Sequence, residues 1–149
     1  MAGDAPVVDT QEWTGQCYCG KVQWKVSGPL LFTAYCHCTA CRGFGGAPYY
    51  EFAAFNLDDY CVVQGTDQIL KVATIPGSPY LRGRCANCGC SIACTKDSEP
   101  KWLSIPLGTV KEYAGVPGRQ MHFNYAFKLP WVDFENDGLP KFPGMPGQE

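Results

Sequence analysis

Short runs of alternating polar and apolar residues recur along the chain, and glycine or proline ends most of them. The clearest run covers residues 21–26, Lys-Val-Gln-Trp-Lys-Val, and stops at Gly28-Pro29. A period of two places alternate side chains on opposite faces of a strand. We therefore expect a strand here and further strands at residues 13–19, 30–35, 48–53, 61–64, 69–75, 80–84, 91–94, 101–107 and 121–129.

Helical patterns are almost absent. Only residues 56–60 are compatible with one helical turn, and Gly43, Gly45 and Gly46 favour a mobile or tightly turned loop. With 17 glycines and 12 prolines in 149 residues, the chain is rich in turns. We expect a mainly β fold with one domain at residues 13–142, an N-terminal lead-in at 1–12 and a C-terminal tail at 143–149.

Composition and charge exclude several classes of partner. The formal net charge is −2, charged residues make up 17% of the chain, and no basic stripe is present. We therefore expect no nucleic-acid partner. The first residues carry acids and no apolar core of a signal peptide, and no run approaches the ~20 apolar residues of a membrane span. We expect a cytoplasmic protein without a membrane partner.

Ten cysteines carry the candidate chemistry. Several stand only one or two residues from the next, a spacing that strains a disulfide and suits ligands of one metal ion. A reducing cytoplasm favours the same interpretation. Two short pairs far apart in the chain make a natural closed zinc site, here called the outer cysteine group: Cys17, Cys19, Cys85 and Cys88. On a strand, Cys17 and Cys19 would face the same side.

Three further cysteines lie within six residues and have no obvious fourth ligand. This central cysteine group consists of Cys36, Cys38 and Cys41. Three protein ligands and one open position are typical of a catalytic zinc ion. The spacing leaves two alternatives: closure by a fourth ligand (Cys90, Cys61, Cys94 or His37), and an exchange of partners between the two groups.

The remaining candidates are interpreted individually. We expect His37 to be solvated, His122 to be a hydrogen-bonded residue, and Cys61 and Cys94 to act as small buried hydrophobes. Arg42, which follows Cys41, is a candidate to bind an anionic substrate. Gly45 and Gly46 could offer backbone N–H groups to a ligand carboxylate.

The cysteine motifs resemble those of the glutathione-dependent formaldehyde-activating enzyme family, which includes the centromere-protein-V-like proteins. The similarity rests on Gly15-Gln16-Cys17-Tyr18-Cys19-Gly20, Cys36-His37-Cys38-Thr39-Ala40-Cys41-Arg42, Gly46-Ala47 and Cys85-Ala86-Asn87-Cys88-Gly89, with a C-terminal pattern from His122 to Pro140. It implies an Mss4-like fold of twisted antiparallel sheets with zinc-binding knuckles. It also implies two Zn²⁺ ions, one structural in the outer cysteine group and one catalytic in the central cysteine group.

The implied activity is that of S-(hydroxymethyl)glutathione synthase, a carbon–sulfur lyase that adds the glutathione thiol to formaldehyde. Glutathione or a glutathione conjugate would be the substrate, and Arg42, Arg82 and Arg84 are candidates to meet its carboxylates. The aromatic run at residues 47–52 is a candidate wall for a pocket larger than formaldehyde needs. The alternative is a non-catalytic zinc module that binds a protein partner. A chromatin role is weaker, because the chain lacks a basic tail.

Overall fold

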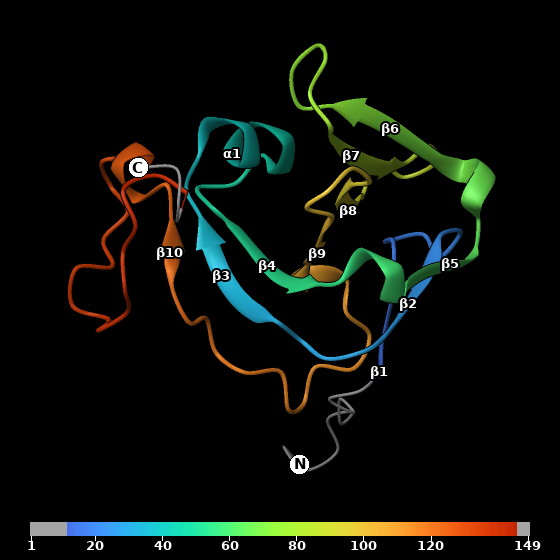
Figure 1. Ribbon diagram of the computed structural model, residues 1–149, viewed down its shortest axis with the longest axis horizontal. Coiled ribbons are helices and arrows are strands. Elements are labelled where there is room, and N and C mark those ends of the chain that lie inside the picture. The colour runs from blue at the N-terminus through green and yellow to red at the C-terminus, as the bar shows by residue number, and fades with distance from the viewer. Residues whose placement is uncertain (1–11, 146–149) are drawn as a thin grey trace.

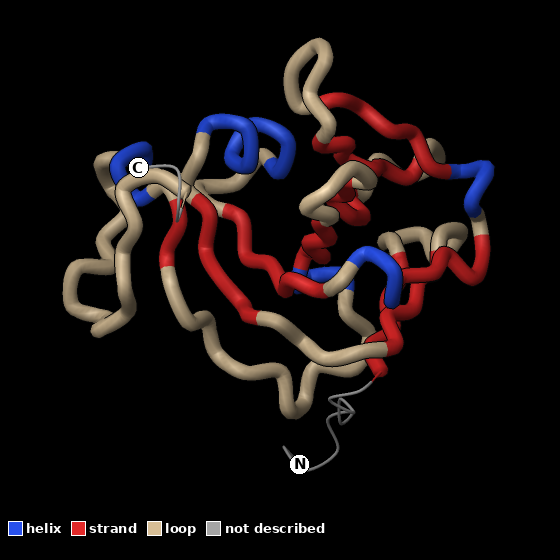
Figure 2. The backbone as a smooth tube through the Cα atoms, in the orientation of Figure 1, coloured by secondary structure: helices blue, strands red, loops and turns tan. Residues whose placement is uncertain are grey.

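Two β-sheets form the framework of residues 12–145, the part of the chain that the computed structural model describes (Figures 1 and 2). The smaller sheet has the antiparallel order β1-β2-β5, and the larger sheet has the order β10-β3-β4-β9-β8-β7-β6. The strands are β1 (Glu12–Gln16), β2 (Gln23–Ser27), β3 (Phe32–Cys36), β4 (Tyr50–Phe55), β5 (Tyr60–Gln64), β6 (Ile69–Ala73), β7 (Tyr80–Cys85), β8 (Ser91–Lys96), β9 (Trp102–Pro106) and β10 (His122–Phe123). The predicted mainly β fold is confirmed.

Helical segments are short. They are α1 (Thr39–Gly45) and the 3₁₀ turns η2 (Leu57–Asp59), η3 (Thr66–Gln68), η4 (Leu107–Thr109) and η5 (Tyr125–Phe127). The single turn expected at residues 56–60 is therefore present. The described residues contain no helix with the length and apolar character that a membrane crossing requires. Of the predicted lead-in and tail, residues 1–11 and 146–149 lie outside the described residues.

The large sheet curves strongly. In Figure 1, β3 and β4 lie on one side, β7 and β8 lie on the other, and α1 sits near the top of the gap between these two walls. The walls are joined through β9, which pairs antiparallel with both β4 and β8. Residues from both walls therefore face each other, although they belong to one sheet.

Two apolar clusters hold the fold together. The larger lies between the sheets and includes Trp13, Trp24, Phe55 and Leu103, all at most 2% exposed. Trp13 meets Phe55 edge-on, with ring centroids 5.1 Å apart. Complete burial of one such large apolar side chain contributes about 1.5–3 kcal/mol. The smaller cluster surrounds Phe52 and Phe123 and includes Cys36 and Cys41, so the central cysteine group is anchored in packed side chains.

Three local predictions were wrong, each for an identifiable reason. The loop predicted around Gly43 and Gly45 is helix α1, because Cys38 caps it: the Cys38 side chain accepts a hydrogen bond from the Cys41 N–H. The strand predicted at residues 121–129 stops after Phe123, because Asn124 adopts a left-handed φ of 55°. Strand β1 ends at Gln16, so the Cys17–Cys19 pair lies in a turn.

Candidate metal centres and adjoining cavities

The outer cysteine group sits on two tight turns. Gly20 N–H donates to the Cys17 carbonyl at 3.1 Å, and Gly89 N–H donates to the Cys85 carbonyl at 2.8 Å. Both glycines have left-handed φ values, +81° and +77°, where any other residue would be strained. Each turn folds its two thiols toward the same point, so the pair expected on a strand is gathered by a turn instead.

The sulfur spacing in the outer cysteine group fits a tetrahedral metal ion. The Sγ atoms of Cys17 and Cys19 lie 3.6 Å apart, and those of Cys19 and Cys85 lie 3.8 Å apart. All four sulfurs lie within 4.8 Å of one another. Tetrahedral zinc with Zn–S bonds of about 2.3 Å places its sulfurs about 3.8 Å apart. Val22 N–H also donates to Cys17 Sγ at 3.3 Å, which stabilises a thiolate. The group could therefore hold a metal ion.

The central cysteine group lies where β3 leads into α1. Cys36 ends β3, Cys38 is the helix cap, and Cys41 lies in the first turn of α1. Their sulfurs lie within 4.8 Å of one another. Hydrogen bonds from the Cys36 and Cys41 thiols lower the pKa of Cys38, whereas the same contacts raise the pKa values of Cys36 and Cys41. Three thiolates at this spacing repel one another, so a bound cation is what allows all of them to lose their protons.

None of the four suggested fourth ligands joins the central cysteine group within residues 12–145. Cys90 Sγ donates to the Ser91 carbonyl at 3.2 Å and packs against the larger core cluster. Cys94 is buried on β8, as predicted, whereas Cys61 is exposed on β5, which corrects the expectation of burial. His37 points away to His122.

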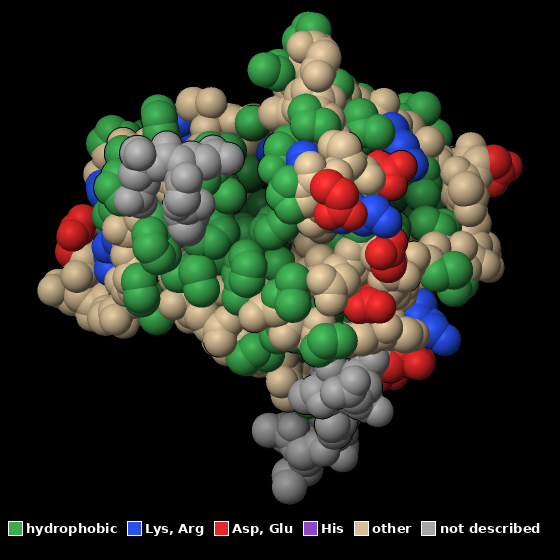
Figure 3. Space-filling model, viewed as in Figure 1, with side chains coloured by type: hydrophobic (Ala, Val, Ile, Leu, Met, Phe, Trp, Pro, Cys, Tyr) green, Lys and Arg blue, Asp and Glu red, His purple; other side chains and the backbone are tan. Residues whose placement is uncertain are grey.

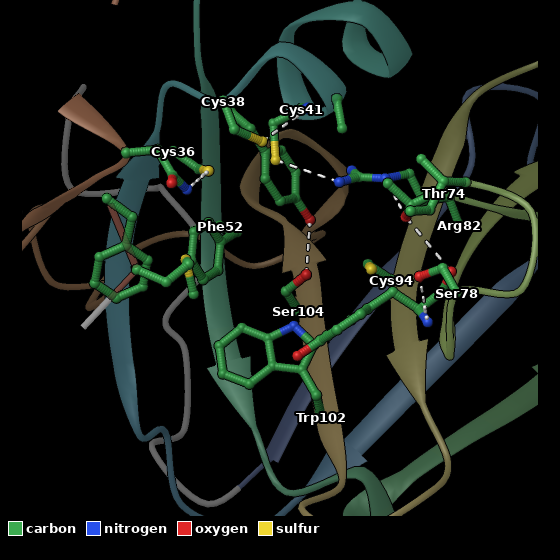
Figure 4. A pocket seen from close by; sticks show the side chains of 17 residues that line it. Cys36, Cys38, Cys41, Phe52, Thr74, Ser78, Arg82, Cys94, Trp102 and Ser104 are labelled. Atoms are coloured by element: carbon green, nitrogen blue, oxygen red, sulfur yellow. Dashed lines mark hydrogen bonds between the residues drawn. The ribbon is translucent and has the colours of Figure 1, made fainter. Parts of the chain in front are cut away.

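Two side chains outside the group support its sulfurs (Figure 4). Arg82 Nη2 donates to Cys41 Sγ at 3.4 Å, and Asn124 Nδ2 donates to Cys36 Sγ at 3.4 Å. Such hydrogen bonds orient metal ligands and adjust their basicity. Arg82 comes from β7, on the opposite wall, so the curvature of the sheet brings its charge to the thiols. Asn124 was missed by the sequence analysis, since one asparagine in an apolar run carries no distinct signal.

A cavity of about 310 Å³ opens below the central cysteine group, between the two walls. Figure 4 shows the cysteines at its upper end and Trp102 across from them, and Figure 3 shows apolar side chains gathered over the middle of this face. We call it the apolar cavity. Among the described residues that line it, Arg82 is the one side chain with a permanent charge. The others are Cys36, Cys38, Ala40, Cys41, Tyr50, Phe52, Thr74, Ile75, Ser78, Tyr80, Cys94, Trp102, Ser104, Phe123, Asn124 and Met145.

A second cavity of about 310 Å³ adjoins the first. The two share four lining residues: Cys41, Tyr50, Arg82 and Cys94. The second cavity adds polar groups, among them Glu51 and Ser91, and glycine backbone at residues 45 and 108. We call it the polar cavity. Arg82 and Cys41 therefore stand where the apolar cavity meets a cavity with a more polar lining.

Arg42 and Gly46, the sequence candidates for substrate contact, lie elsewhere. Both line a separate cavity beside α1, together with Leu129 and Trp131, and neither lines the apolar or the polar cavity. Arg42 Nε donates to the His37 carbonyl at 3.1 Å, and Gly46 N–H donates to the Arg42 carbonyl at 2.8 Å. Arg84, another candidate, donates to the carbonyls of Phe44 and Gly89. Of the three arginines, Arg82 alone reaches a thiol of the central cysteine group.

His37 and His122 form a buried pair behind the central cysteine group. Both are fully buried, which corrects the expectation that His37 is solvated and confirms that His122 is hydrogen-bonded. Burial and the neighbouring His122 lower the pKa of His37 to about 4, so its imidazole is neutral near pH 7. On the side of His122 away from His37, Asp137 Oδ2 lies 2.6 Å from His122 Nε2.

Comparison with known proteins gives the following matches. A family model described as glutathione-dependent formaldehyde-activating enzyme matches residues 12–125. A relative from Halomonas elongata, which carries the provisional name of glutathione-dependent formaldehyde-activating enzyme, is 25% identical over 139 residues, covering 90% of this chain and 88% of the relative. The crystal structure of a Rhodobacter sphaeroides protein matches with a TM-score of 0.55 at 20% identity, covering 87% of this chain and 98% of that one. At that identity, the structural match shows a shared fold alone.

Proposed function

Because this chain belongs to the glutathione-dependent formaldehyde-activating enzyme family, we propose that it is a zinc-dependent enzyme that joins the thiol of glutathione to an aldehyde at the central cysteine group. This is the activity of a carbon–sulfur lyase of the S-(hydroxymethyl)glutathione synthase type. One observation carries the proposal: three cysteine sulfurs without a fourth described ligand face a cavity that also contains Arg82.

Both cysteine groups have a donor set that suits Zn²⁺. Four sulfurs at tetrahedral spacing make the outer cysteine group a closed, structural site, whereas three sulfurs leave one position for substrate in the central cysteine group. Zn²⁺ in the central group would supply Lewis acidity and favour the ionised form of a nearby thiol. The remaining roles in the proposed reaction fall to the residues around the central cysteine group.

Each neighbouring residue has a definite task in this proposal. Arg82 offers a positive charge to the thiolate and to a substrate carboxylate, since a guanidinium pairs well with anions. Asn124 holds Cys36 in place through its 3.4 Å hydrogen bond. The aromatic wall around Phe52 and Trp102 excludes water from the reacting carbonyl. Roles for Arg42 and Gly46 in holding glutathione stay predictions from the sequence.

The reaction balances without a further reagent. The glutathione sulfur attacks the carbonyl carbon, a C–S bond forms, and the C=O π bond opens. The carbonyl oxygen receives the proton that the thiol releases, which gives an S-(hydroxymethyl)glutathione when the aldehyde is formaldehyde. The reverse reaction returns the thiol and the aldehyde.

Replacement of Cys38 by serine tests the proposal. The serine hydroxyl can still accept the Cys41 N–H bond, so α1 keeps its cap while the central group loses one thiolate. We expect a folded protein in which zinc falls from two ions per chain to one, with no formation of the glutathione–formaldehyde adduct above the uncatalysed rate in exchange NMR. Cys61→Ser, at an exposed cysteine outside both groups, is the matched control and should keep both ions and full activity.

Two results would contradict the catalytic assignment. One is wild-type protein with a single zinc ion, and the other is turnover that survives Cys38→Ser. The alternative function, a non-catalytic zinc module, requires a closed central site. A fourth thiolate ligand, detected by X-ray absorption of the zinc-loaded protein, would support that module.

A further inference from the structure

The apolar cavity is much larger than formaldehyde requires. Its volume of about 310 Å³ is roughly ten times the ~30 Å³ that one water molecule occupies in the liquid. Phe52, Trp102, Phe123 and Met145 are among the apolar side chains of its wall, and Ile75 stands at its rim with 65% of its surface exposed. Formaldehyde would gain little binding free energy from this apolar wall, because a molecule with one carbon atom has almost no apolar surface to bury.

The same cavity is poorly suited to glutathione itself. At neutral pH, glutathione carries two carboxylates, one ammonium group and two amides. Among the described lining residues of the apolar cavity, Arg82 can meet a carboxylate, but no acidic side chain can meet the ammonium group. A buried ionic group without a partner is costly.

The polar cavity supplies what the apolar cavity lacks. Its lining includes the carboxylate of Glu51, the hydroxyl of Ser91 and glycine backbone. The side chain of Glu51 is 43% exposed, and its ion pair within residues 12–145, to Arg119 at 3.5 Å, leaves carboxylate oxygen accessible for an ammonium group. The polar cavity thus offers a partner for the ammonium group and, through Arg82, for one of the two carboxylates of glutathione.

Arg82 and Cys41 lie where the two cavities meet. On the basis of the proposed function, we infer that glutathione occupies the polar cavity and that the aldehyde brings a bulky apolar substituent, about the size of a phenyl ring, into the apolar cavity. The substrates are then aromatic or long-chain aldehydes, R–CHO, and the products are S-(1-hydroxyalkyl)glutathiones. The sulfur attacks the carbonyl carbon, the C=O π bond opens, and the oxygen takes the thiol proton, as for formaldehyde.

Unreactive thioethers test this assignment through binding alone. Isothermal titration calorimetry on the zinc-loaded full-length protein would compare glutathione, S-methylglutathione and S-benzylglutathione. We expect S-benzylglutathione to bind at least about tenfold more tightly than S-methylglutathione, because the phenyl ring buries apolar surface in the cavity. In Trp102→Ala this ratio should fall at least about threefold. Trp131→Ala, at an exposed tryptophan outside both cavities, should leave the ratio unchanged.

A second variant guards against a misfolded Trp102→Ala protein. Ile75→Asn changes an exposed side chain at the rim and should also reduce the ratio, whereas Val63→Asn, an exposed valine on β5 that lines neither cavity, should not. Equal binding of the two thioethers, with glutathione still bound, would overturn the inference and leave the proposed function intact. Failure of all three compounds to bind would overturn both.

Discussion

His37 Nε2 lies 2.9 Å from His122 Nδ1, in the interior directly behind the central cysteine group. His122 Nε2 in turn lies 2.6 Å from Asp137 Oδ2. A carboxylate accepts, so His122 donates through Nε2, and in a neutral His122 the Nδ1 atom then accepts from His37 Nε2–H. These hydrogen bonds thus set the tautomers of both neutral rings. They also connect Asp137, in the C-terminal segment, to His37, which lies between Cys36 and Cys38.

Asp137→Asn should weaken this connection. The pKa of Asp137 lies below its ordinary 3.8: partial burial raises it, but hydrogen bonds from Lys141, the Leu139 N–H and His122 lower it more. A carboxylate with a depressed pKa stabilises the folded state above pH 3.8, and this contribution is lost as pH falls further. We expect a loss of about 1–2 kcal/mol in unfolding free energy at pH 7 and a smaller difference from wild type at pH 3.5, both measured by urea denaturation.

Asp58→Asn provides the control for Asp137→Asn. Asp58 pairs with Lys101 at 2.9 Å, but its side chain is 76% exposed, and such surface pairs contribute about 0–1 kcal/mol. A loss in Asp58→Asn as large as that in Asp137→Asn would show that the buried position of the His122–Asp137 contact is unimportant.

Cys88→Ser should prevent folding. Binding of structural zinc supplies about 10–16 kcal/mol in small zinc domains, which is comparable with the whole stability of about 5–15 kcal/mol of a typical domain. Cys88 belongs to the outer cysteine group, which joins the turn after β1 to the turn after β7. Circular dichroism should show no cooperative thermal transition. A transition at the wild-type temperature, in a protein with two zinc ions, would refute the structural assignment.

Arg82→Gln and Arg42→Gln distinguish between two of the cations that the sequence suggested for glutathione. Arg82 contacts Cys41 and faces both cavities, so its loss should raise the KM for glutathione by about 10–100-fold. Arg42 lines only the cavity beside α1, and its loss should change that KM less than about threefold. Steady-state kinetics with both variants gives the answer. Equal increases in the KM for glutathione would indicate that glutathione binds over α1. They would contradict its assignment to the polar cavity.

Asn124→Ala and Asn124→Gly form a matched pair. Both remove the 3.4 Å hydrogen bond to Cys36, so both should weaken zinc binding at the central group by about tenfold in a chelator competition assay. Only alanine must also hold the left-handed φ of 55°, which costs about 1–2 kcal/mol. The alanine variant should therefore unfold at lower urea concentration than the glycine variant. Zinc affinity equal to wild type in both would show that Asn124 only shapes the backbone.

The sequence predicted those features that depend on residues close together in the chain. The alternation at residues 21–26 placed β2, and the cysteine spacing grouped the thiols as the structure does. The aromatic run at residues 47–52 correctly indicated a cavity wall, since Tyr50 and Phe52 line the apolar cavity.

What could not be predicted depends on contacts between distant parts of the chain. Arg82 could not be preferred over Arg42, because only the curvature of the large sheet carries β7 to the thiols. The burial of His37 depends on His122, 85 positions later, and no local pattern contains that information. Helix α1 forms although its glycines have low helix propensity, because the Cys38 cap and the packing of Cys41 outweigh that cost.

The outer cysteine group also bears on how the protein is made. Cys19 and Cys85 are 66 positions apart, so during translation the early pair leaves the ribosome well before its partners exist. If this group binds zinc, as we propose, two thiolates alone would hold the ion weakly, and all four ligands are present only once Cys85 and Cys88 emerge. A cell short of zinc at that moment would release a chain that cannot close its fold and is open to proteolysis. The yield of folded protein would then depend on the zinc available during synthesis.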